Sequence, residues 1–123
     1  MRQFLLDTYQ RELYVELGRS QDERLAGIAA KSLKETEYHW RFSSRWLVRL
    51  GDGTAESHER VARALAELWP YTNELFDPDA TDRAMTEAGI APALAVLEAR
   101  WRLAVGAVID EATLVAPAER GKL

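Results

Sequence analysis

The residues of this sequence that could do chemistry lie close together in residues 34–40, a segment that contains Glu35, Tyr38 and His39. Helical di-iron sites need a glutamate and a histidine three residues apart, so that both side chains project into the core of a bundle. In this segment Tyr38 stands three residues after Glu35, and Thr36 stands three residues before His39. The required pair of ligands is therefore absent.

A weaker metal interpretation remains for Glu35 and His39, which are four residues apart and would share one face of a helix. Two ligands are too few for a metal centre unless a matching set comes from elsewhere. A polar or ion-paired structural role is the favoured interpretation. We expect no catalytic residue, no cofactor-binding residue and no metal ligand in this chain.

Other kinds of catalytic site are excluded by residue type. The chain has no cysteine, which rules out disulfides, thiolate zinc sites and a cysteine nucleophile. No glycine-rich phosphate loop and no nucleophile elbow is present. His58 stands among charged residues and is expected to be solvated surface without a role. An independent enzyme is not expected.

Composition and charge narrow the choice of partners. The 123 residues carry a formal charge of −4, and this mild acidity argues against a nucleic-acid partner. Asp7 interrupts the first apolar residues too early for a signal peptide, and no later apolar run is long enough to span a bilayer. We expect a cytoplasmic protein without a membrane partner.

Helical periodicity of the apolar residues predicts an all-α chain organised as a single domain over residues 1–123. Gly18, followed by Ser20 and Glu23 in the pattern of a capping box, marks the turn between the first two helices. Pro70 is expected to kink the third helix near residues 68–70, because proline lacks an N–H. Helices are expected at residues 3–17, 21–50, 81–88 and 92–114. Another helix is expected to begin at residue 54 and to end before the chain break at 77–79, and residues 115–123 are expected to form a loose tail.

The predicted core follows the apolar stripes of these helices, and the charged Arg11, Glu12 and Glu16 are expected on the surface. Phe42 and Trp46 fall off the stripe of the second helix, so this helix needs partners on more than one face. The predicted stripes are Leu6, Tyr9, Leu13 and Leu17; Leu25, Ile28, Ala29, Leu33, Trp40, Ser43, Leu47 and Leu50; Val61, Leu65, Leu68, Thr72 and Leu75; and Leu94, Leu97, Trp101, Val105, Val108 and Ala112.

Two long segments carry a resemblance to a known family: residues 30–43 (AKSLKETEYHWRFS) and residues 46–54 (WLVRLGDGT). The likeness continues through residues 68–69, 74–77, 87–90 and 110–114. Over nearly its whole length the chain resembles the C-terminal half of PaaC, the structural subunit family of phenylacetyl-CoA epoxidase (ring 1,2-phenylacetyl-CoA monooxygenase).

The resemblance implies a ferritin-like helical bundle and a non-catalytic role. In that family the di-iron site lies in a separate catalytic subunit. With oxygen and electrons from a reductase, the complex epoxidises the aromatic ring of phenylacetyl-CoA during aerobic phenylacetate breakdown. This chain is then implied to scaffold the di-iron catalytic subunit, its expected partner, and to hold no cofactor itself.

One departure from the family concerns the bundle itself. Family members begin with two further long helices before the segment that matches Met1, so the chain lacks the first two helices of the bundle. It is then either a fragment or a homo-oligomer in which a second chain completes four helices through the apolar faces of the first two. The alternative function is a self-assembled ferritin-like metal-binding protein or di-iron oxidase, with ligands from both copies.

We also expect a vestigial metal pocket between the first two helices. If Asp7 faces Glu35 across the antiparallel helix pair, the two carboxylates occupy part of that pocket, and Tyr38 and His39 are its other candidates. Burying two carboxylates without a cation raises at least one pKa and destabilises the fold. We therefore expect a proton there, or Lys31 or Lys34 as a charge partner.

Overall fold

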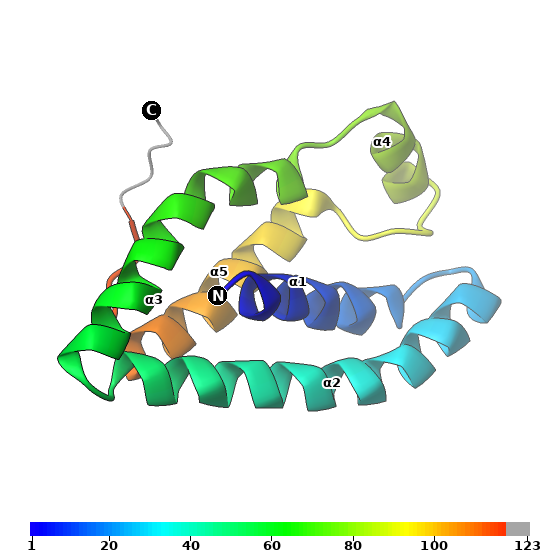
Figure 1. Ribbon diagram of the computed structural model, residues 1–123. Coiled ribbons are helices and arrows are strands. Elements are labelled where there is room, and N and C mark those ends of the chain that lie inside the picture. The colour runs from blue at the N-terminus through cyan, green and yellow to red at the C-terminus, as the bar shows by residue number, and fades with distance from the viewer. Residues whose placement is uncertain (118–123) are drawn as a thin grey trace.

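The computed structural model describes residues 1–117, and in that range the chain is helical without strands (Figure 1). The predicted all-α fold class is confirmed, with an arrangement that fits part of a ferritin-like helical bundle. The elements are α1 (Arg2–Leu17), α2 (Glu23–Gly51), α3 (Ala55–Leu68), the 3-10 helix η1 (Trp69–Phe76), α4 (Ala80–Glu87) and α5 (Leu94–Glu111).

The start of α2 differs from the predicted capping box. Asp22 is the N-cap, and its carboxylate accepts hydrogen bonds from the backbone N–H groups of Arg24 and Leu25, both at 3.1 Å. The Ser20 hydroxyl instead accepts the N–H of Asp22. A carboxylate at this position satisfies two orphan donors and interacts favourably with the helix dipole, which explains why Asp22 replaces Ser20 as the cap. Thr54 caps α3 as predicted, through the N–H of Ser57.

Pro70 ends a helix and does not merely kink it. The α3 helix stops at Leu68, and the chain continues as the tighter helix η1, with Pro70 in its first turn. Proline has no N–H to donate to the carbonyl one turn earlier, so the α-helical hydrogen-bond pattern cannot continue through it. Farther along, α5 begins at Leu94, two residues after the predicted start at Pro92.

The antiparallel helices α1 and α2 lie side by side, and α5 crosses behind α1 in the view of Figure 1. The core lies where α1, η1 and α5 meet, around the fully buried Trp101. The Trp101 ring lies 5.6 Å from that of Trp69 and 5.3 Å from that of Phe76, measured between centroids. The predicted stripe of α5 is confirmed, with Leu94 at its half-buried end.

The predicted stripe of α1 is wrong in detail. Its four residues, Leu6, Tyr9, Leu13 and Leu17, are only half-buried. The most enclosed side of the helix faces both α2 and α5, and it carries the buried residues Phe4, Leu5, Asp7, Thr8 and Glu12. On α2, Ile28 and Leu50 were also predicted to be core, but they are 55% and 38% exposed.

The end of α2 meets the end of α5 at Gly51. A Cβ on Gly51 would collide with the carbonyl of Ala112 and lie 2.9 Å from its Cβ. The Gly51 carbonyl accepts a hydrogen bond from the Thr113 hydroxyl at 3.2 Å and lies 2.8 Å from His58 Nδ1. His58 is therefore half-buried and holds the start of α3 against this junction, which corrects its expected place on the solvated surface.

We expect Gly51→Ala to lower the free energy of unfolding by about 1–3 kcal/mol, because the added methyl group forces the two backbones apart. Gly27→Ala is the matched control, since a Cβ on this helical glycine meets nothing within 4 Å. Alanine there should stabilise α2 by roughly 0.5–1 kcal/mol. Urea denaturation followed by circular dichroism measures both, and equal effects of the two substitutions would contradict the close approach.

Two further expectations concern the C-terminal tail and membrane-spanning segments. Residues 115–117 lie outside any helix, and the rest of the predicted tail, 118–123, lies outside the described residues. Among residues 1–117 no helix is long and apolar enough to cross a membrane.

Candidate functional site

The expected metal pocket corresponds to the seam between α1 and α2. There the Trp40 indole N–H donates a hydrogen bond to the Thr8 hydroxyl at 3.0 Å, and Thr8 in turn donates to the Phe4 carbonyl at 2.9 Å. One turn away, the Ser43 hydroxyl donates to Asp7 at 2.9 Å. These pairs fix the register of the two helices.

Asp7 is buried, with 2% of its surface exposed, and both of its carboxylate oxygens have a donor. The Gln3 amide donates to Oδ1 at 2.7 Å, and the Ser43 hydroxyl donates to Oδ2 at 2.9 Å. Neutral polar groups thus satisfy this carboxylate, and the expected partners Lys31 and Lys34 are exposed on α2. The expectation of a lysine beside Asp7 is wrong.

The structure does not bring Asp7 and Glu35 together. Asp7 pairs with Ser43, which is eight residues from Glu35 and so about 12 Å farther along the helix axis. Glu35, Tyr38 and His39 are all exposed on the solvent side of α2, where the Tyr38 and His39 rings lie 5.9 Å apart. The expected facing pair is wrong because the register of two antiparallel helices is set by contacts such as Asp7 to Ser43.

The residues of the seam do not fit a di-iron centre. Such a centre needs several carboxylates and histidines converging on one point in a bundle. Within residues 1–117 no group of three or more His, Cys, Asp or Glu side chains is arranged to hold a metal ion. The carboxylate oxygens of Asp7 are already hydrogen-bonded to Gln3 and Ser43.

An ion-pair network that the sequence pattern did not predict extends the seam to α5. The buried Glu12 lies 2.8 Å from Arg100 Nε and 3.4 Å from Arg11 Nη1. Arg100 also contacts Glu16 at 3.4 Å, and Arg11 contacts Glu37 of α2 at 3.4 Å. The Arg11 guanidinium stacks 4.1 Å from the centroid of the Trp40 ring. Arg11, Glu12 and Glu16 were expected on the surface, but they tie α1 to α2 and α5.

The pKa shifts have structural causes and do not mark an acid and base pair. Burial raises the pKa of the Tyr9 phenol, and the negative charge of Asp82 adds to this effect. The pKa of Asp79 is lowered chiefly because its carboxylate accepts the backbone N–H of Asp82 in the capping box of α4. In both cases the charged neighbour is Asp82, whose side chain takes part in this same capping box.

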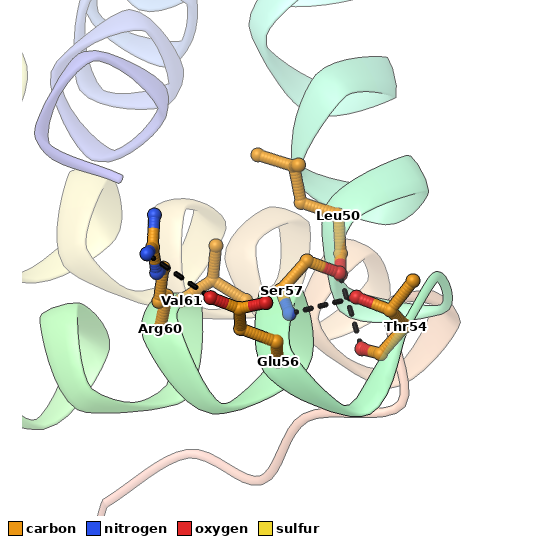
Figure 2. A pocket seen from close by; sticks show the side chains of 6 residues that line it. All are labelled: Leu50, Thr54, Glu56, Ser57, Arg60 and Val61. Atoms are coloured by element: carbon orange, nitrogen blue, oxygen red, sulfur yellow. Dashed lines mark hydrogen bonds and ion pairs between the residues drawn. The ribbon is translucent and has the colours of Figure 1, made fainter.

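A hollow at the corner between α2 and α3 is lined by residues with structural roles (Figure 2). Its Thr54 hydroxyl accepts the N–H of Ser57, and the Ser57 hydroxyl donates to the Leu50 carbonyl. Its charged residues, Glu56 and Arg60, pair with each other at 3.1 Å. The polar groups of this hollow are thus engaged in capping and pairing, which does not suggest a substrate site.

The outer face of α2 is another candidate site. Tyr38, Phe42, Trp46 and Leu50 follow one another at four-residue intervals, and we call these four residues the α2 ridge. They are 67%, 60%, 45% and 38% exposed, respectively. Phe42 and Trp46 contact each other, with ring centroids 6.3 Å apart. Exposed apolar side chains that gather in this way are typical of a protein interaction site.

Comparison with known proteins agrees with the resemblance in the sequence. The family model described as "Phenylacetic acid catabolic protein" matches residues 1–122. The C subunit of the 1,2-phenylacetyl-CoA epoxidase of Escherichia coli (strain K12) is 45% identical over 119 residues, which are 97% of this chain and 48% of that protein. The chain therefore spans about half the length of the curated relative it matches. The chain belongs to the phenylacetic acid catabolic protein family.

Proposed function

We propose that this chain is a non-catalytic structural subunit of a multicomponent phenylacetyl-CoA epoxidase in aerobic phenylacetate breakdown. The observation that carries the proposal is the polar seam between α1 and α2. There Asp7 pairs with Ser43, and Thr8 pairs with Trp40. Among the described residues no set of side chains converges to hold a metal ion. The 45% identity to a subunit of such an epoxidase supports the choice of complex. The complex is proposed to work in the cytoplasm.

In this proposal the di-iron centre and the oxygen chemistry belong to a separate catalytic subunit. The part played by this chain is to present a surface of fixed shape to that subunit. Arg100 bridges α5 to α1 through Glu12 and Glu16, and Arg11 bridges α1 to α2 through Glu37. Three helices joined in this way keep their relative positions, which a scaffold requires.

Iron analysis combined with reconstitution tests the proposal against the alternative of a self-assembled metal-binding protein or di-iron oxidase. The chain is purified without chelator, and its iron is measured before and after mixing with the catalytic subunit. We expect substoichiometric iron in the chain alone, and phenylacetyl-CoA epoxidation that requires the iron of the catalytic subunit. Stoichiometric iron in the chain alone, with oxidase activity, would contradict the non-catalytic role.

A further inference from the structure

Residues 77–92 carry α4 and have few contacts with the rest of the chain, and we call this segment the α4 strap. In Figure 1 α4 lies at the edge of the bundle, where two loops join it to η1 and α5. Among the helices of residues 1–117, α4 is the one that has no buried residue. A helix of eight residues is unstable by itself in water, so α4 depends on the few contacts that the strap makes.

The polar contacts between the α4 strap and the body are concentrated at one point. In the described part of the chain the strap forms no ion pair with another element. Its hydrogen bond to the body runs from the Gln21 N–H, in the turn between α1 and α2, to the Gly89 carbonyl at 3.0 Å. The Gln21 side chain lies against Gly89, because a Cβ on Gly89 would stand 2.7 Å from the Gln21 Cδ. We call Gln21 and Gly89 the clasp.

Hydrogen bonds within the strap close both ends of α4. At the start, Asp79 accepts the N–H of Asp82 at 2.8 Å, and Asp82 accepts the N–H of Asp79 at 3.0 Å. At the end, Gly89 has a φ of +75°, a left-handed conformation that favours glycine, and the Ile90 N–H donates to the Met85 carbonyl at 2.9 Å. These bonds connect the ends of α4 to its body, so the short helix forms or unwinds cooperatively.

A pocket of about 370 Å³ lies between α4 and the start of α5, and its apolar lining includes Phe76, Pro78 and Leu94. Asp82 of α4 also lines this pocket. Its negative charge adds to the effect of burial in raising the pKa of Tyr9, whose ring lies 5.8 Å from that of Phe76. The strap is thus held beside the Tyr9 and Phe76 rings across space that side chains leave open, and it gains little packing energy there.

We propose that the α4 strap detaches from the body as one unit, while α1, α2 and α5 keep their packing, and that detachment exposes Phe76 and Leu94. The clasp closes the strap, and the extended residues at its two ends act as hinges. Segments with few buried contacts open locally at a lower free energy than the core does, and lids are drawn from such segments. This inference goes beyond the proposed function, because the opening is a property of the chain alone.

Hydrogen exchange on the whole chain tests whether the strap opens as a unit. The N–H groups of Arg83, Ala88 and Ile90 are hydrogen-bonded within the strap, and that of Gln21 is bonded across the clasp. We expect these four amides to have protection factors within about threefold of one another and at least about 100-fold below that of the Val105 amide in α5. Strap amides as protected as Val105, or a Gln21 amide that exchanges independently of the strap, would overturn the proposal.

Thiol labelling tests what the opening exposes, and the absence of cysteine from the chain makes a single introduced thiol specific. Leu94→Cys places a thiol beside the strap, whereas Val105→Cys places one in the core, at a residue that is 1% exposed. A maleimide should react with the first at least about 100-fold faster than with the second, which becomes accessible only on global unfolding.

Gly89→Ala then tests the clasp in both cysteine variants. Alanine disfavours the left-handed conformation and its methyl group displaces the Gln21 side chain, so labelling at residue 94 should become at least about threefold faster, with no change at residue 105. Gly106→Ala is the matched control, because a Cβ there meets nothing within 4 Å, and it should accelerate neither site. Equal labelling rates at the two sites, an unchanged rate at residue 94, or an equal acceleration at both would overturn the proposal.

Discussion

Replacing Trp101 with alanine is expected to lower the free energy of unfolding by about 3–5 kcal/mol. Trp101 is fully buried and packs against the tilted rings of Trp69 and Phe76, so its removal leaves a large cavity between α5 and η1. Its indole N–H also donates a hydrogen bond to the Leu5 carbonyl at 3.1 Å, and the substitution removes this link between α5 and α1. A loss of this size is a large part of the total stability of roughly 5–15 kcal/mol of a typical domain.

The measurement is urea denaturation followed by circular dichroism at one protein concentration. Tyr71→Ala is the matched control, because it removes an aromatic ring that is 66% exposed on the same element that carries Trp69. Its cost should stay within about 0.5 kcal/mol, as for most surface substitutions. If the two substitutions had similar costs, Trp101 could not be the centre of the core.

Replacing Arg100 with methionine is expected to lower the free energy of unfolding by about 2–4 kcal/mol, because the buried carboxylate of Glu12 loses its nearest cation. Arg100 Nε lies 2.8 Å from Glu12, whose side chain is 7% exposed, whereas the remaining partner Arg11 is 3.4 Å away. The cost should fall toward the lower end of this range, since the Arg100 side chain is 36% exposed and water screens part of the interaction.

A double-mutant cycle separates the pair from the packing around it. Combining Arg100→Met with Glu12→Gln should recover most of the lost stability, because the neutral amide no longer needs a cation. Arg60→Met is the control for an exposed pair, since Arg60 and Glu56 are 74% and 76% exposed, and it should cost no more than about 0.5 kcal/mol. Equal effects of Arg100→Met with and without Glu12→Gln would show that the buried charge is unimportant.

The parts of the fold with strong periodicity could be predicted from the sequence. The stripe from Leu97 through Trp101 to Val108 repeats at helical spacing, and the structure buries these residues as predicted. The predicted core stripe of α1 was wrong because a helix that packs on two sides buries more than one row of residues. Thr8 and Glu12 are turned inward there, since Trp40 and Arg100 satisfy their polar groups. A pattern that assigns polar residues to the surface cannot detect such pairs.

The candidate site was the least predictable part, because it depends on contacts between helices. Spacing along one helix places Glu35, Tyr38 and His39 correctly on neighbouring positions. It does not give the register against α1, and the structure pairs Asp7 with Ser43 instead of Glu35. The exposed ridge was partly visible, since Phe42 and Trp46 fall off the predicted core stripe. Both residues are exposed in the structure, and a further partner for α2 stays a prediction.

In the proposed function, this chain binds and supports the catalytic subunit of a phenylacetyl-CoA epoxidase. The most direct measurement is size-exclusion chromatography with light scattering on the chain, on the catalytic subunit and on their mixture. We expect a single species in the mixture, heavier than either component alone and containing both proteins. Two separately eluting proteins with the masses that they have alone would contradict the claim.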